Sequence, residues 1–202
     1  MTFDFWPLTF PKEGFLSFWQ KLFYGAGVAF ELGRFFVVVI VLLLVSHYFL
    51  YTIFVISGPS MESNFYDKEV VMVSRLNLFT NRFQRGEPMV LKFPGDPKHK
   101  KYIKRLIGLP GDTVEIADGA IHVNGKKLPE SYLDESTVTM PALNGEVSWR
   151  LKDNQYFLMG DNRENSSDSR DWGIAQRRDM IGPVKMIVFP FSRFEFVPVP
   201  PY

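Results

Sequence analysis

Residues 101–123 read KYIKRLIGLPGDTVEIADGAIHV and contain three short runs of β-branched, aromatic or alternating residues. The pairs Pro110-Gly111 and Asp118-Gly119 separate these runs. An Asp-Gly pair between two such runs is typical of a two-residue β-hairpin. The segment therefore predicts consecutive strands joined by tight turns.

Similar runs recur through the chain after residue 57, with Asn124-Gly125 as a further turn signal. The expected strands are residues 69–74, 88–93, 101–107, 113–117, 120–123, 155–159 and 184–189. Short runs at this spacing indicate an all-β domain. The predicted fold class is mostly β, with a β-rich domain over residues 57–202.

Upstream of this domain, residues 35–56 read FFVVVIVLLLVSHYFLYTIFVI and contain no charged side chain. As a helix this run would be about 33 Å long, enough to cross a bilayer once. A cleavable signal peptide has a shorter apolar stretch that lies nearer the terminus. We therefore expect an uncleaved, single transmembrane helix over residues 34–56.

Residues 1–33 form an aromatic-rich N-terminal tail, in which Phe15, Trp19 and Phe23 recur at helical spacing. The tail is either a short helix at the membrane interface or a partly ordered segment whose rings lie at headgroup level. Among the nearest basic residues on either side of the apolar run, Arg34 abuts it and favours a cytoplasmic N-terminus.

Composition limits the remaining choices. The chain has 202 residues, enough for one ordinary domain and an anchor, and its formal net charge of +1 gives no field that would hold nucleic acid. It has no cysteine, so a disulfide framework, a thiol nucleophile and a zinc-thiolate site are all excluded.

Ser60 lies in the sequence SGPSM, residues 57–61, directly after the apolar run. Gly58 permits a tight backbone turn and Pro59 restricts the approach to it, so Ser60 can present both its hydroxyl and its amide to a carbonyl. The same composition is also ordinary for a juxtamembrane linker. The pentapeptide alone leaves both interpretations open.

Lys104 and Arg105 lie in the expected strand 101–107, where side chains alternate between two faces. Lys104 shares its face with Tyr102 and Leu106, and an apolar environment lowers a lysine pKa by disfavouring the ammonium form. A neutral lysine can act as the base for a serine nucleophile. Arg105 on the other face stays charged and requires a partner, unless both residues simply face solvent.

Residues 160–170, GDNRENSSDSR, form a polar loop after an apolar run. Asp168 and Arg170 offer a carboxylate and a guanidinium, and the carboxylate is a candidate partner for Arg105. A calcium loop of the EF-hand type is disfavoured, because Ser166 and Trp172 stand where that pattern needs glycine and glutamate.

Four motifs in this order resemble the type I signal peptidases, membrane-bound Ser/Lys endopeptidases that remove signal peptides from exported proteins. The motifs are residues 57–61, 85–93 (RGEPMVLKF), 102–112 (YIKRLIGLPGD) and 160–170. The resemblance implies a mostly β catalytic domain on the extracytoplasmic side of the cell membrane. It also implies cleavage after small residues at Ala-x-Ala-like sites, without a cofactor or metal.

By the same resemblance, Ser60 is expected to be the nucleophile and Lys104 the general base. The expected supporting residues are Ser166, Asp168, Arg105 and Arg170. Gly58, Pro59 and Tyr102 are expected to line the oxyanion and substrate cleft. The expected partners are pre-proteins bearing signal peptides, the lipid bilayer and, as a candidate, the secretion translocon, with no nucleic acid.

The sequence departs from the family pattern around the nucleophile. Members often read Met-x-Pro-Thr-Leu here, whereas Met61 is followed by ESNF, residues 62–65. Some members carry a serine at the position of Gly58, whose hydroxyl helps to hold the oxyanion. A catalytically inactive, membrane-anchored binding module is therefore the alternative function, and a cleavage assay separates the two. Self-cleaving DNA-binding regulators share the Ser/Lys chemistry but are soluble, which the apolar run argues against.

Overall fold

The structure is a computed structural model and describes residues 12–77, 82–94 and 100–202. Contacts divide the chain into two compact units, Met1–Ser46 and His47–Tyr202. The predicted tail lies outside the described residues as far as residue 11, and from Lys12 onward its residues belong to a helix.

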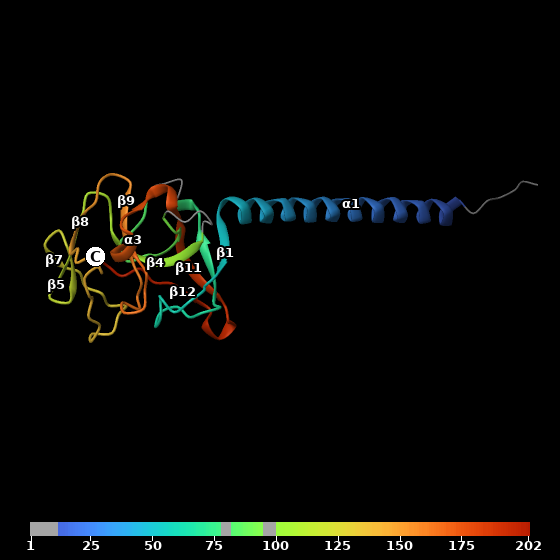
Figure 1. Cartoon of the computed structure of the whole chain (residues 1–202). Coiled ribbons are helices and arrows are strands. Elements are labelled where there is room, and N and C mark those ends of the chain that lie inside the picture. The colour runs from blue at the N-terminus through green and yellow to red at the C-terminus, as the bar shows by residue number, and fades with distance from the viewer. Residues whose placement is uncertain (1–11, 78–81, 95–99) are drawn as a thin grey trace, which may run out of the picture. The chain divides into compact units, whose positions relative to one another are not determined.

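Helix α1 (Lys12–Phe49) is 38 residues long and is drawn in blue in Figure 1. Its segment Gly27–Ser46 is long and apolar enough to cross a membrane, by length and composition. This segment has 20 residues, which at 1.5 Å per residue is about the thickness of the hydrocarbon core. Its large apolar side chains are exposed, except Val39, which is half-buried. The helix therefore agrees with the predicted anchor.

The predicted C-terminal boundary of that anchor is wrong. Helix α1 ends at Phe49, and strand β1 (Tyr51–Val55) follows, so the last part of the expected span 34–56 is not helical. Strand β1 pairs antiparallel with β2 (Val70–Ser74) along its whole length. Aromatic and β-branched residues favour a strand, and an apolar run alone cannot distinguish a strand from a helix when a partner strand is available.

The larger sheet has eight strands among the described residues. In order these are β1, β2, β11 (Met180–Phe189), β3 (Pro88–Lys92), β4 (Lys101–Gly108), β9 (Gln155–Met159) and β10 (Ala175–Gln176), with β12 (Glu195–Phe196) paired to β11. Strand β11 pairs with β2 through one part and with β3 through another, and register shifts interrupt both pairings. A long strand with such irregularities can bend a sheet.

A smaller sheet has the order β7 (Lys126–Lys127), β6 (Ala120–Val123), β5 (Thr113–Ala117) and β8 (Ser148–Arg150). Asp118 and Gly119 join β5 to β6 with φ values of 51° and 72°. Positive φ at both residues is what a type I′ hairpin requires. The predicted hairpin and the predicted mostly β fold are confirmed.

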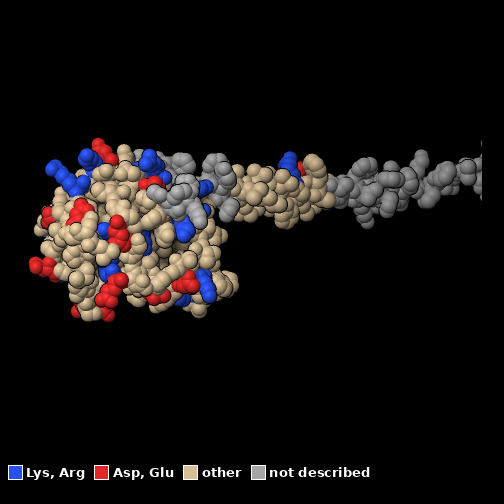
Figure 2. All heavy atoms as spheres, viewed as in Figure 1, with Lys and Arg blue, Asp and Glu red and all other residues tan. Residues whose placement is uncertain are grey.

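Among the described residues, three apolar clusters form the core of the β unit, and short helical turns connect its strands. These turns include α3 (Ser169–Trp172), η1 (Arg177–Asp179) and η2 (Phe191–Arg193). One cluster joins the small sheet to β9 through Trp149 and Phe157, whose ring centroids are 4.7 Å apart. The second lies mainly on β2 and β11, with Val90 of β3 and Ile103 of β4, and Phe54 of β1 packs against it. The third lies mainly on β3, β4 and β9. Figure 2 shows acidic and basic side chains interspersed on the visible face of this unit.

Candidate active site

Strand β4 carries Lys104 between two neighbouring strands. Lys104 is opposite Met89 of β3, and the adjacent pair, Arg105 and Met159, joins β4 to β9. A lysine between two paired strands is shielded from water on both sides, and only 1% of Lys104 is exposed. Leu106 on the same face belongs to a buried apolar cluster, as the alternation of the sequence predicts.

Burial lowers the pKa of Lys104 from 10.5 to about 8. The nearby carboxylate of Asp168 opposes this shift, and the charge of Arg170 adds to it. Desolvation has the larger effect because the ammonium ion loses its hydration in the strand interior. A useful neutral fraction of Lys104 therefore exists near neutral pH.

Ser166 is the polar neighbour of this lysine. Lys104 Nζ donates a hydrogen bond to Ser166 Oγ at 2.9 Å, although 62 residues separate them in sequence. Ser166 is half-buried in the loop that follows β9. The contact fixes the amine in direction as well as in place.

Gly160 is where the Ser60 turn meets the Ser166 loop. A Cβ atom added to Gly160 would lie 2.1 Å from Ser166 Oγ and 2.5 Å from the Ser60 carbonyl oxygen. The same carbonyl accepts a hydrogen bond from Asn162 N at 3.1 Å. The absence of a side chain at Gly160 thus lets the Ser60 backbone approach the loop that carries Ser166, the hydrogen-bond partner of Lys104.

The backbone around Ser60 is a tight turn. Gly58 has φ of +93°, in the region that favours glycine, and its N–H donates to Asp67 Oδ1 at 2.9 Å. Pro59 is exposed, and its carbonyl accepts from Asn162 Nδ2 at 3.3 Å. Ser60 itself is half-buried. The turn therefore contacts the loop at Asn162, with Gly58 half-buried and Pro59 at the surface.

Tyr102 is the third residue predicted to line the cleft, and it lies on β4. Its ring packs against Phe93, with centroids 5.2 Å apart, at the edge of the cluster on β3, β4 and β9. It is half-buried and lies two residues before Lys104 on the same face.

Arg105 pairs with Asp161, and the candidate pairing with Asp168 is wrong. Arg105 Nε and NH2 donate to the two oxygens of Asp161 at 2.7 and 2.5 Å. Because Arg105 faces Met159 across the β4–β9 ladder, the carboxylate two residues beyond Met159 lies within reach of its side chain. The prediction that Arg105 requires a partner is confirmed, but the partner is a different carboxylate of the same loop.

Asp168 is bound within its own loop. It is buried, and it accepts from Arg170 Nε and NH2 at 2.9 and 2.8 Å and from Gly160 N at 3.0 Å. Burial alone would raise the pKa of Asp168, but its hydrogen bonds with Arg170 hold that pKa below its usual value. This ionised pair stiffens the segment that carries Ser166.

Three polar side chains outside the loop, Glu130, Thr139 and Tyr132, contact Arg163 or Arg105 and were missed from sequence. Arg163 is buried and pairs with Glu130, and it also donates to Thr139 Oγ1. Tyr132 lies over Arg105, with the guanidinium carbon 3.9 Å from the ring centroid. Residues 130–139 show no strong local pattern, so the charge of Arg163 within the motif was the only available signal that a partner was needed.

Within the described ranges, no group of three or more His, Cys, Asp or Glu side chains is placed to hold a metal ion. A serine in a tight turn, a buried lysine of lowered pKa and a second serine bonded to that lysine together make the candidate site of a serine hydrolase. In the Ser/Lys variant of this class, lysine takes the place that histidine has in a catalytic triad.

Comparison with known proteins identifies the family. The family model described as "Signal peptidase, peptidase S26" matches residues 29–189. The chain is 34% identical over 169 residues to signal peptidase I of Bacillus licheniformis, covering 81% of this chain and 90% of the relative. It is 36% identical over 171 residues to signal peptidase I S of Bacillus subtilis strain 168, covering 80% and 90%. The chain therefore belongs to the signal peptidase family, peptidase S26.

A crystal structure of a signal peptidase I from Enterococcus faecalis is also similar, with 28% sequence identity and a TM-score of 0.43. The match covers 50% of this chain and 96% of that chain.

Proposed function

We propose that this chain is a signal peptidase I that uses a Ser60/Lys104 dyad to cleave signal peptides from exported pre-proteins. Cleavage would follow small residues at Ala-x-Ala-like sites. The observation that carries the proposal is the buried Lys104 amine, 2.9 Å from Ser166 Oγ, in the loop that contacts the Ser60 backbone. Membership of a peptidase family and the relatives named signal peptidase I support the same activity.

In the proposed reaction, Ser60 Oγ attacks the scissile carbonyl while neutral Lys104 accepts the hydroxyl proton. The tetrahedral intermediate then collapses, and the lysine returns the proton to the leaving amine. A water molecule, deprotonated by Lys104, hydrolyses the acyl-enzyme. Ser166 keeps the amine pointed at the reacting atoms through its hydrogen bond.

The proposed supporting residues act by holding these groups in place. The pair of Asp168 and Arg170 fixes the Ser166 loop, and the pair of Arg105 and Asp161 fixes the start of that loop against β4. The Ser60 amide would hold the oxyanion. Gly58 contributes no hydroxyl to that task, and one donor of this kind is typically worth about 10² to 10³ in rate.

The substrate would bind as an extended strand along a cleft that includes Gly58, Pro59 and Tyr102. Helix α1 would anchor the chain as a single-pass protein of the cell membrane, with the catalytic unit on the extracytoplasmic side. Arg34 beside the apolar segment supports that orientation. The site would then act on pre-proteins as the secretion translocon delivers them.

The test is cleavage of a pre-protein with an Ala-x-Ala site by the full chain purified in detergent. We expect cleavage at that site, and its loss in Ser60→Ala and Lys104→Ala without loss of the folded state. Ser167→Ala is the matched control, because Ser167 is an exposed neighbour of Ser166. A folded Lys104→Ala variant with full activity would remove the mechanism, and no cleavage of several pre-proteins by the wild type would favour the binding-module alternative.

A further inference from the structure

Asn64 lies in the turn where this chain departs from the pattern of its family, four residues after Ser60. The turn is closed by backbone hydrogen bonds from Asn64 N and Phe65 N to Met61 O, at 3.0 and 2.9 Å. These bonds shape the turn itself, but they do not attach it to the remainder of the site. That attachment comes from the backbone N–H of Asn162, which binds the Ser60 carbonyl, and from the Asn64 side chain.

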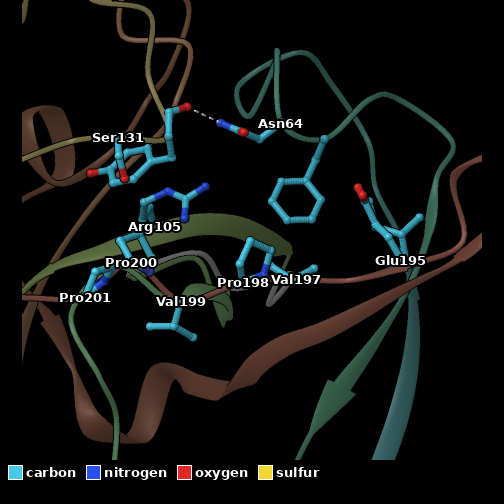
Figure 3. A pocket seen from close by; sticks show the side chains of 12 residues that line it. Asn64, Arg105, Ser131, Glu195, Val197, Pro198, Val199, Pro200 and Pro201 are labelled. Carbon is cyan, nitrogen blue, oxygen red and sulfur yellow. Dashed lines mark hydrogen bonds between the residues drawn. The ribbon is translucent and has the colours of Figure 1, made fainter.

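The amide group of Asn64 binds two separate segments. Asn64 Nδ2 donates to Tyr132 O at 2.8 Å and to Asp161 Oδ2 at 2.9 Å, so both of its hydrogens are used. In Figure 3 Asn64 lies at the edge of a pocket of about 380 Å³, and Arg105 extends from the strand into the same pocket. The amide therefore joins the nucleophile turn to the loop after β9 and to the segment around Tyr132.

Asp161 is a rigid acceptor for this bond. It is 3% exposed, and Arg105 binds both of its oxygens. Asp161 also directly precedes Asn162, whose backbone N–H binds the Ser60 carbonyl. The Ser60 turn is thus attached to one loop at two points, the Ser60 carbonyl and the Asn64 side chain.

We propose that Asn64 is a positioning residue that fixes the turn carrying Ser60 against the loop carrying Ser166. The inference rests on the proposed function, because it concerns the distance between that nucleophile and the lysine that Ser166 orients. Small displacements of reacting groups cost large factors in rate. Loss of the amide donors should therefore lower kcat, whereas KM depends mainly on the cleft and should change little.

The test compares Asn64→Thr with Asn64→Val, which have nearly the same shape and differ in one hydroxyl donor. The full chain in detergent is assayed on a pre-protein, with rates divided by the concentration of folded enzyme. We expect kcat of Asn64→Val to fall about tenfold or more, with KM within about threefold of the wild type. We expect Asn64→Thr to lose less activity than Asn64→Val, because its hydroxyl, although one bond shorter than the amide, keeps one donor beside Asp161.

Asn124→Ala is the matched control, since Asn124 Nδ2 donates to Asp112 Oδ1 at 2.8 Å outside the proposed machinery. It should lower stability and leave kcat unchanged. If Asn64→Val does not fold, Asn64→Ser and Asn64→Ala give a second pair with and without a donor.

Equal kcat in the paired variants, or a change confined to KM, would overturn the role of Asn64 while leaving the proposed function intact. Absence of cleavage by the wild type would instead overturn the proposed function, and this inference with it.

Discussion

At the scale of single residues, the candidate site depends on a position without a side chain. Gly160 lies against both Ser166 Oγ and the Ser60 carbonyl, so the loop after β9 and the Ser60 turn approach each other there. The sequence marks this glycine only as the first residue of a polar loop. Its close contacts come from segments about a hundred residues apart.

We expect Gly160→Ala to lower the cleavage rate by about 100-fold or more, because the new methyl group must displace the Ser166 loop or the Ser60 turn. Initial rates on a pre-protein, with circular dichroism to monitor folding, would measure this. Gly33→Ala is the control, since a Cβ there meets nothing within 4 Å. A folded Gly160→Ala variant of normal activity would contradict the arrangement described here.

The pKa of Lys104, lowered by burial to about 8, predicts the pH dependence of cleavage. The base must be neutral, and below its pKa the neutral fraction falls about tenfold for each pH unit. We therefore expect kcat/KM to rise from pH 6 to about pH 8 and then to level off. A flat profile between pH 6 and 9 would count against lysine as the base.

At the scale of elements, the strands were largely predictable. The expected strands 113–117, 120–123 and 155–159 coincide with β5, β6 and β9. Their turns carry Gly, Asn or Asp, which report local backbone conformation directly. Strand β1 was missed, since its apolar residues continue the composition of the helix and its strand character depends on pairing with β2.

The β4–β9 register decides the ion pair between Arg105 and Asp161, both only 3% exposed. We expect Asp161→Ala to lower the free energy of unfolding by about 3–5 kcal/mol, because it leaves Arg105 charged and uncompensated in the interior. Urea denaturation would measure the change.

Asp153→Ala is the control for this variant, because Asp153 is exposed. A surface substitution of that kind should stay within about 0.5 kcal/mol of the wild type. If Asp161→Ala also lowers the free energy of unfolding by only about 0.5 kcal/mol, the buried pair contributes little to stability.

At the scale of the whole molecule, the chain combines an exposed apolar helix with a β unit that has its own core. All three apolar clusters consist of residues from Phe54 onward. The structural boundary between anchor and β unit therefore falls before β1, and the predicted boundary at residue 57 would cut that strand away.

Two truncated chains test this boundary. We expect residues 50–202 to fold, and residues 57–202 to unfold at a clearly lower urea concentration. The shorter chain lacks β1, so the edge of β2 that pairs with β1 is left without a partner strand. It also removes Phe54 and Ile56 from an apolar cluster. Circular dichroism with urea would compare them, and equal midpoints would argue that β1 is dispensable.

The sequence by itself determined the mostly β class, the apolar helix and the four motifs, because turn residues, alternation and apolar runs act between neighbours in the chain. It also predicted that Lys104 has apolar companions and that Arg105 requires a partner. Only the tertiary structure decided that the partner is Asp161, that Glu130 binds Arg163, and that Asn64 joins the Ser60 turn to the loop. These contacts join residues between about 30 and 100 positions apart, and sheet register and loop packing, which no local pattern encodes, bring them together.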